Sequence, residues 1–427
     1  MNNQQLQNAI DVGNFDKLFK ELYPSRHLSA RARYLQIVDS FVRQYGPSED
    51  LRLFSVPGRV EIGGNHTDHQ HGHVLAAAIT LDAVAAAAKN DSDIISVYSA
   101  GFGEIRLSLS DLAAVPKERG NNAALIRGIA ARFRQLGYEA QGFDAYISSD
   151  VPPGSGMSPS AAFEVLIATI INGLFNDSKI PPVTLAQIGK YAETVYYGKP
   201  NGLMYQCACA VGGFCAIDFE NFDEPEVEFI NCDLTAHGYA LCLVAAGGSH
   251  ANLTNEHAAI PAEMRGIARY FRKEFLGEVS RAEFEAALYR DLRIRFHDRA
   301  LLRALHFFDE DERVISQIRA LREGDIKAFL QCVRDSGHSS AEVLQNIYPS
   351  GNINERTLSL AFGICGNILG RNGAWRINGE GFIGSVLAIV PVNLLDNFRE
   401  KIEIVFGPGR CYVLTVRQAG SFCLNKE

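Results

Sequence analysis

A glycine-serine segment that runs directly into an apolar helix constrains this chain more than any other feature. Residues 151–162 read Val-Pro-Pro-Gly-Ser-Gly-Met-Ser-Pro-Ser-Ala-Ala, and the apolar pattern continues to residue 175. The first amides of such a helix lack backbone acceptors and lie at the positive end of its dipole, so they can bind a phosphate. Taken alone, the segment also fits ordinary loop glycines at Gly154 and Gly156, followed by an N-cap at Ser158.

The two common nucleotide-binding motifs do not explain this segment. The sequence holds no Gly-x-x-x-x-Gly-Lys-Ser/Thr, and its Gly-x-Gly-x-x-Gly match at 379–384 lies near the C-terminus. A dinucleotide fingerprint instead opens a helix after an early strand. Other motifs must therefore decide which phosphate ligand the turn binds.

Composition excludes several classes of protein. The 427 residues are 47% hydrophobic and 21% charged, which is typical of a globular protein with two or three structural units. The net charge of -8 is spread along the chain, and no basic block alternates with aromatic residues. We therefore expect neither nucleic acid nor a membrane as a partner.

Targeting and cysteine patterns indicate a cytoplasmic protein. The longest apolar run, 74–88, is interrupted by Thr80 and Asp82 and is too short to cross a bilayer, and the N-terminus lacks the regions of a signal peptide. The nine cysteines include no Cys-x-x-Cys pair, so reduced core thiols are expected and a zinc site or disulfide framework is not.

The periodicity predicts a mixed α and β chain. Strands are expected at 53–62, 74–88, 94–98, 105–109, 143–148, 213–219, 226–230, 239–246, 375–378, 386–390 and 411–416. Helices are expected at 34–45, 123–136, 158–175, 185–197 and through most of 256–334. We divide the chain into an N-terminal extension (1–33), a first domain (34–215) and a second domain (216–427).

A second motif combines polar groups suited to a hydroxyl-rich ligand. Residues 57–68 read Pro-Gly-Arg-Val-Glu-Ile-Gly-Gly-Asn-His-Thr-Asp at the end of a predicted strand. Asp68 can accept two sugar hydroxyls, while Asn65 and His66 supply donors at fixed positions. Two alternatives remain, a β-turn with a helix cap and a metal cluster, and the residues of that cluster would be His66, His69, His71 and His73.

This motif resembles the galactokinase signature, Gly-Arg-Val-Asn-x-x-Gly-Glu-His-Thr-Asp, from which the chain departs at Glu61 and Asn65. Residues 154–160 match the second hallmark of the wider GHMP small-molecule kinase superfamily, and 373–384 match the third. The resemblance implies an α+β GHMP kinase two-domain fold. Its N-terminal domain would be ribosomal S5 domain 2-like, and its C-terminal domain would be an α/β domain of the ferredoxin-like type.

The resemblance also implies the reaction and the ligands. ATP would phosphorylate the anomeric hydroxyl of galactose or a related hexose between the domains, with Arg59 stabilising the transferred phosphoryl group. Residues matching the sugar pocket are Asn65, His66, Asp68 and Gly202. The phosphates would be bound by Gly154, Ser155, Gly156, Ser158 and Ser160. Ser160 and Glu193 would hold Mg²⁺, which prefers hard oxygen ligands. We expect a monomer with no other partner.

The chain departs from the family pattern at the catalytic position. Galactokinases carry Gly-x-Met-Asp-Gln, whereas residues 202–206 read Gly-Leu-Met-Tyr-Gln, so Tyr205 occupies the position of the catalytic aspartate. A phenol is protonated at neutral pH and its ring is longer than a carboxylate. The alternative is a core aromatic residue, although Met204 and Gln206 keep the motif in register.

Two further departures affect the same ligands. Pro159 replaces the middle serine of the phosphate segment and offers no amide hydrogen, although proline suits a first helical turn. Glu380 adds a negative charge to the third motif, unless it faces solvent.

Three functions follow from the resemblance. The first is a galactokinase-like kinase with reduced or altered activity. The second is a sugar-binding or regulatory pseudokinase, and the third is a kinase for another small metabolite, which the retained sugar motif disfavours.

Overall fold

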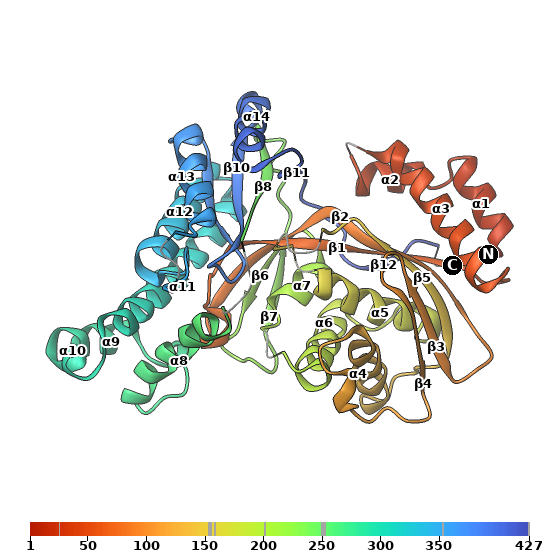
Figure 1. Ribbon diagram of the computed structural model, residues 1–427, viewed down its shortest axis with the longest axis horizontal. Helices are drawn as coiled ribbons and strands as arrows, with labels where there is room; N and C mark the ends of the chain where they lie inside the picture. Colours follow the sequence, from red (N-terminus) through yellow and green to blue (C-terminus); the bar gives the residue numbers. More distant parts are fainter. Residues whose placement is uncertain are drawn as a thin grey trace.

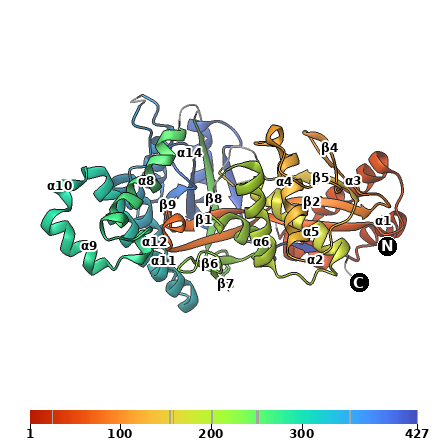
Figure 2. The ribbon, with the colours of Figure 1, turned by 90° about the horizontal axis from the view of Figure 1, so that it is seen from below.

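The chain folds into two β-sheets with helices packed against their faces, as the computed structural model shows (Figure 1). The structure describes residues 1–24, 26–152, 156–157, 159–199, 202–248, 253–351 and 354–425. The two ends of the chain lie on the same side of the molecule, opposite α9 and α10 (Figure 1; Figure 2).

Two long strands organise the larger sheet, which has eight strands in the described residues. Its path runs β12-β1-β2-β5-β3-β4, and β6 and β7 continue from the first half of β2. The strand β2 pairs with β6 through 73–77 and with β5 through 83–89. Both faces are covered, which explains why 74–88 is nearly continuously apolar. The strands are β1 (Arg52–Gly63), β2 (His73–Lys89), β3 (Ile94–Ser99), β4 (Gly103–Ser108), β5 (Phe143–Ser149), β6 (Phe214–Asp218), β7 (Glu226–Ile230) and β12 (Phe422–Cys423).

Four helices cover one face of this sheet and bury a large apolar core, in which Val56, Ile126 and Val165 are fully buried. They are α4 (Asn122–Gln135), α5 (Pro159–Phe175), α6 (Pro182–Tyr191) and α7 (Met204–Val211), and a π-helical turn (Ala192–Tyr197) follows α6 directly.

The N-terminal extension covers the opposite face of the sheet. It forms α1 (Asn3–Asp11), α2 (Asp16–Leu22) and the start of α3 (His27–Tyr45), so a single helix crosses the predicted limit at residue 33. Their apolar faces pack on β1 and β2 in a core of their own, where Phe19 stacks on Tyr34. The extension is therefore part of the folded body.

The smaller sheet forms the second half of the molecule, with strand order β11-β8-β10-β9. Its strands are β8 (Tyr239–Gly247), β9 (Ala374–Asn378), β10 (Gly384–Pro391) and β11 (Cys411–Leu414). The helices of this half are α8 (Thr254–Tyr270), α9 (Arg281–Ala287), α10 (Arg293–Arg295), α11 (Asp298–Glu323), α12 (Ile326–Ser339), α13 (Thr357–Leu369) and α14 (Leu395–Phe406). One face packs on α13 and α14, and the other contributes to a core shared with α11, α12 and the long strands.

The predicted domain limit at residues 215 and 216 stays a prediction. The chain passes from one sheet to the other between Ile230 and Tyr239, and residues 422–423 return to the larger sheet beside β1.

In the described residues, no helix is long and apolar enough to span a membrane.

Candidate functional site

Arg59 and Tyr205 lie face to face where β1 meets α7. Arg59 is 1% exposed, and its Cζ lies 3.3 Å from the centre of the Tyr205 ring. Its Nη1 donates to the carbonyl oxygen of Gly156 at 3.1 Å. A guanidinium over an aromatic face is attracted by the ring, and more strongly when water is excluded. The phenol ring therefore occupies one face of the arginine that was predicted to stabilise the phosphoryl group.

The phenol of Tyr205 is not a base at neutral pH. Burial raises its pKa far above the ordinary value, although the charge of Arg59 opposes the shift. The hydroxyl is therefore protonated, as the sequence predicted, and offers a donor where a carboxylate would accept.

Glu61 and Asn65 form one hydrogen bond that explains their departure from the signature. Asn65 Nδ2 donates to Glu61 Oε1 at 2.9 Å, and Arg376 Nη2 donates to the same oxygen at 2.9 Å. The signature carries asparagine at the first position and glutamate at the second. In this chain the order is reversed, with the carboxylate at Glu61 and the amide at Asn65. The Glu61 carboxylate is neutralised by Arg376.

Asn65 is also buried, since the residue is 1% exposed. Its Nδ2 makes a second bond to the carbonyl of Gly379 at 2.8 Å, and its Oδ1 accepts from Asn346 Nδ2 at 2.7 Å and Ser340 Oγ at 3.2 Å. Asn65 therefore connects the sugar motif to the second half of the molecule.

Asp68 and Gly202, from the two predicted parts of the sugar pocket, are in contact. A Cβ at position 202 would overlap the Oδ2 atom of Asp68, so any larger residue there would displace the Asp68 carboxylate. Burial raises the pKa of Asp68 to about 6, against the charge of His66. His66 has a φ of 64°, a conformation rare outside glycine, and its Nε2 donates to the carbonyl of Glu380 at 3.0 Å.

The four histidines do not form a metal cluster. His66 contacts His69, but His71 stacks on Phe275 and His73 pairs with Asp311. No group of three or more histidine, cysteine or acidic residues in the described part of the chain is arranged to hold a metal ion.

Gly156 joins the phosphate segment to the other two motifs. Its φ is 78°, and its carbonyl accepts from Asn378 Nδ2 at 2.9 Å as well as from Arg59. A Cβ at this position would lie 2.7 Å from Ser385 Oγ. Gly154, Ser155 and Ser158 lie outside the described residues.

The first turn of α5 holds a proline, as the sequence analysis expected. Pro159 is its first residue, where no intrahelical donor is lost, and Ser160 follows as an exposed residue of the first turn.

Glu164 shares a hydrogen-bond donor with Glu193, and the sequence analysis did not single it out. It lies one helical turn after Ser160 and is fully buried, and its Oε2 accepts from Gln206 Nε2 at 2.9 Å. Glu193, on the π-helical turn after α6, accepts from the same Nε2 at 2.9 Å. The available signal was a single carboxylate in an otherwise apolar helix.

The two carboxylates share one amide donor, and Glu164 Oε1 has no hydrogen-bond partner among the described residues. Burial raises the pKa of Glu164 well above its ordinary value, and the charge of Glu193 raises it further. A hard divalent cation would satisfy these oxygens, so the residues fit Mg²⁺.

Glu380 faces two basic side chains. Its carboxylate lies 3.7 Å from Lys199 Nζ and 3.6 Å from His257 Nδ1. Burial alone would raise its pKa, but the charges of Lys199 and His257 outweigh burial and lower it. The negative charge in the third motif is therefore partly neutralised.

Two segments match known families. Residues 39–89 match the galactokinase galactose-binding signature, and residues 124–213 match the GHMP kinases N terminal domain. The galactokinase of Streptomyces coelicolor is 31% identical over 373 residues, which cover 86% of this chain and 92% of that protein. The galactokinase of Clostridium tetani is 28% identical over 373 residues, which cover 86% of this chain and 91% of that protein.

Solved structures show the same fold. The galactokinase of Lactococcus lactis, complexed with galactose, superposes with a TM-score of 0.76 at 23% identity over 90% of this chain and 97% of that chain. A mevalonate kinase superposes with a TM-score of 0.59 at 16% identity over 85% of this chain and 98% of that chain. The chain has the GHMP kinase fold, and with its three motifs assembled around Arg59 and its resemblance to curated galactokinases, it belongs to the galactokinase family.

Proposed function

We propose that this protein phosphorylates the anomeric hydroxyl of galactose or a related hexose with ATP, slowly. The observation that carries the proposal is the stack of Arg59 on Tyr205, with a protonated phenol at the position of the family's catalytic aspartate. Phosphoryl transfer depends mainly on positioning and electrostatics, so a kinase without its base is slowed by about a hundredfold to ten-thousandfold and keeps some activity.

The sugar would bind beside Asp68, His66 and Gly202. The contact between Asp68 and Gly202 is maintained, and a buried carboxylate is the acceptor that sugar hydroxyls need. Asn65 belongs to the proposed sugar site as a support for the adjacent His66, since its own polar atoms bind protein groups.

The nucleotide phosphates would bind the glycine-serine segment at the start of α5. Gly156 lies between Arg59 and the third motif, and the proposal includes Gly154, Ser155, Ser158 and Ser160. Mg²⁺ would be held by Ser160 and Glu193, and we add Glu164 because its carboxylate shares the Gln206 amide with Glu193. The ion would neutralise charge on the phosphates.

A second candidate is a pseudokinase that binds a sugar without phosphorylating it. The observation in its favour is that Arg59 is held by Tyr205 and Gly156 while Asp68 and Gly202 remain in contact. The two candidates share the sugar site and differ only in turnover.

We further propose a cytoplasmic monomer that binds sugar and ATP. Eight of the nine cysteines are buried, which suits core thiols in a reducing compartment.

The test combines turnover with binding. The protein, ATP and Mg²⁺ are mixed with a panel of hexoses, ADP release is followed, and sugar binding is measured by calorimetry. Slow sugar-dependent ADP release supports the kinase, and sugar binding without release supports the pseudokinase. Fast turnover on galactose would contradict a disabled site, and no response to any sugar would exclude both candidates.

A further inference from the structure

Asp150 marks the point where the larger sheet ends and the phosphate segment begins. It follows β5 directly, and its amide donates to the carbonyl of Asp82 at 2.9 Å. The next residue, Val151, is 3% exposed and is the first of the glycine-serine segment. The position of Asp150 therefore sets where this segment leaves the sheet.

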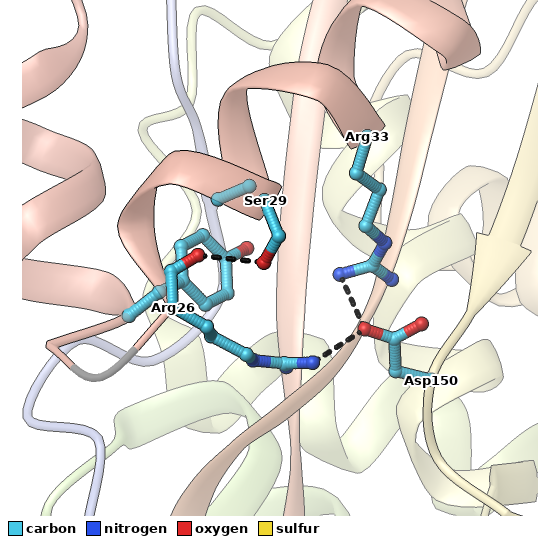
Figure 3. Close-up of a pocket in the computed structure, with 6 residues that line it drawn as sticks. Arg26, Ser29, Arg33 and Asp150 are labelled. Carbon is cyan, nitrogen blue, oxygen red and sulfur yellow. Dashed lines mark hydrogen bonds and ion pairs between the residues drawn. The ribbon is translucent and has the colours of Figure 1, made fainter.

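Two arginines of the N-terminal extension and α3 converge on the Asp150 carboxylate. Arg26 Nη1 lies 2.9 Å and Arg33 Nη1 lies 3.1 Å from the same Oδ2 atom, and both guanidinium groups point toward it in Figure 3. Arg26 Nη2 also donates to the carbonyl of Thr80 at 2.7 Å. A cavity of about 180 Å³ lies among these side chains, so the Asp150 carboxylate lies at the edge of open space on this side.

Arg33 is itself held from inside the sheet. It forms an ion pair with Asp82, which is fully buried, and its Nη2 donates to the Asp82 carbonyl at 3.0 Å. The partner of Asp150 is therefore fixed before any ligand binds.

A shift of Asp150 would reach the catalytic arginine through one packing contact. A Cβ on Gly58 would lie 3.0 Å from Val151 Cγ2, so Val151 packs directly against the strand residue that precedes Arg59. At the other end of the segment, the carbonyl of Gly156 is bound by Arg59 itself.

We propose that Arg26 and Arg33 are positioning residues for nucleotide binding, which act by holding Asp150 at the root of the phosphate segment. The proposal rests on the proposed function, because it assumes that this segment binds ATP phosphates. It gives the N-terminal extension a role in the kinase site.

The same helix supplies a matched control. Arg31 forms an ion pair with Asp16 inside the extension, and the side chains of Arg31 and Arg26 are both 33% exposed. Arg31→Gln thus removes a comparable ion pair from α3 without touching Asp150.

The experiment measures nucleotide binding and backbone exchange in the full chain. The dissociation constant of a non-hydrolysable ATP analogue with Mg²⁺ is determined by calorimetry, alongside that of galactose. Amide hydrogen exchange is followed in the peptide that spans residues 148–157. The variants are Arg26→Gln, Asp150→Asn, their combination, Arg26→Lys and Arg31→Gln.

We expect Arg26→Gln and Asp150→Asn to weaken nucleotide binding about threefold to tenfold, the effect of a partly exposed ion pair, and to speed exchange at 148–157. The combined variant should bind the nucleotide no more weakly than the single variant with the lower affinity, because both substitutions remove the same ion pair. Arg26→Lys should restore part of the affinity, while galactose affinity and Arg31→Gln should stay near wild type.

Unchanged exchange and unchanged nucleotide affinity in both single variants would overturn the inference, as would equal losses in Arg31→Gln. If the wild-type protein binds no nucleotide, the proposed function fails, and exchange at 148–157 still decides whether the arginines hold this segment.

Discussion

Asp82 and Glu164 are both fully buried carboxylates, yet their surroundings differ completely. Asp82 forms ion pairs with Arg33 and Arg417, whose charges overcome the effect of burial and lower its pKa. Glu164 has no basic partner among the described residues, and burial together with the charge of Glu193 raises its pKa.

The difference separates a structural centre from a ligand site. Asp82 also accepts from the hydroxyls of Tyr23 and Ser55, so its network connects the extension, the sheet and the C-terminal segment with every acceptor satisfied. Glu164 has an oxygen that lacks a hydrogen-bond partner in the part of the chain that the structure describes, which a bound cation would satisfy. Buried carboxylates with strongly shifted pKa values cluster at functional sites, so Glu164 is a candidate for ligand binding.

Removing the Asp82 charge should have the largest effect on stability. Asp82→Asn leaves the buried Arg417 and the partly buried Arg33 without the carboxylate that they share, so we expect the free energy of unfolding to fall by about 3–5 kcal/mol. Urea denaturation measures it. The matched control is Asp144→Asn on the same sheet, where burial already raises the pKa and the carboxylate accepts from the Asn90 amide. A similar loss there would contradict the comparison.

Removing the Glu164 charge should have the opposite sign. Glu164→Gln relieves a buried like-charge contact, so the free energy of unfolding at pH 8 without Mg²⁺ should rise by about 1–3 kcal/mol. The same variant should lose the thermal stabilisation that Mg²⁺ with an ATP analogue gives the wild type. A destabilised variant that still responds fully to Mg²⁺ would show that Glu164 is a structural residue.

The pH dependence should distinguish the two carboxylates a second time. Because the folded state raises the pKa of Glu164, its charge costs stability above the ordinary pKa of about 4.5, and this cost fades as the pH falls. The stability gap between Glu164→Gln and wild type should therefore shrink from pH 8 to pH 5.

Asp82 has a lowered pKa, so its contribution is present above about 3.8 and is lost only in stronger acid. The gap between wild type and Asp82→Asn should stay constant over the same range. Thermal melts of the three proteins at four pH values would measure both stability gaps. Parallel curves for Glu164→Gln and wild type would show that Glu164 does not have a raised pKa in the folded protein.

Glu380 lies between these two cases, and its removal should have the smallest effect. It is partly exposed and only partly neutralised by Lys199 and His257. We expect Glu380→Ala to improve the affinity for an ATP analogue by about threefold, within the range of exposed ion pairs. Calorimetry at two salt concentrations tests this, since the gain should decline with salt, whereas a salt-independent tenfold gain would indicate steric hindrance.

Local patterns predicted most of the fold. The strands at 53–62 and 74–88 correspond to β1 and β2, because an apolar run covered on both faces leaves a continuous signal. The helices α13 and α14 were not predicted, because both lie beyond the predicted helical region, which ended near residue 334.

The partners of the key side chains were beyond local patterns. Motifs located Glu61, Asn65 and Arg376, but not the ion pair that joins Glu61 to Arg376 across 315 residues of the chain. The same holds for Asp82 and Arg417, separated by 335 residues. Charge pairing across the fold depends on which strands meet, and this information is not present in any single window of sequence.

The rate of galactose phosphorylation by Tyr205→Asp, compared with wild type and Tyr205→Phe, tests whether the phenol limits turnover. The carboxylate restores an acceptor and frees one face of Arg59, so the rate should rise by about a hundredfold or more, while Tyr205→Phe stays as slow as wild type. A wild-type protein that already turns over rapidly, and that loses activity in both variants, would contradict the role assigned to Tyr205.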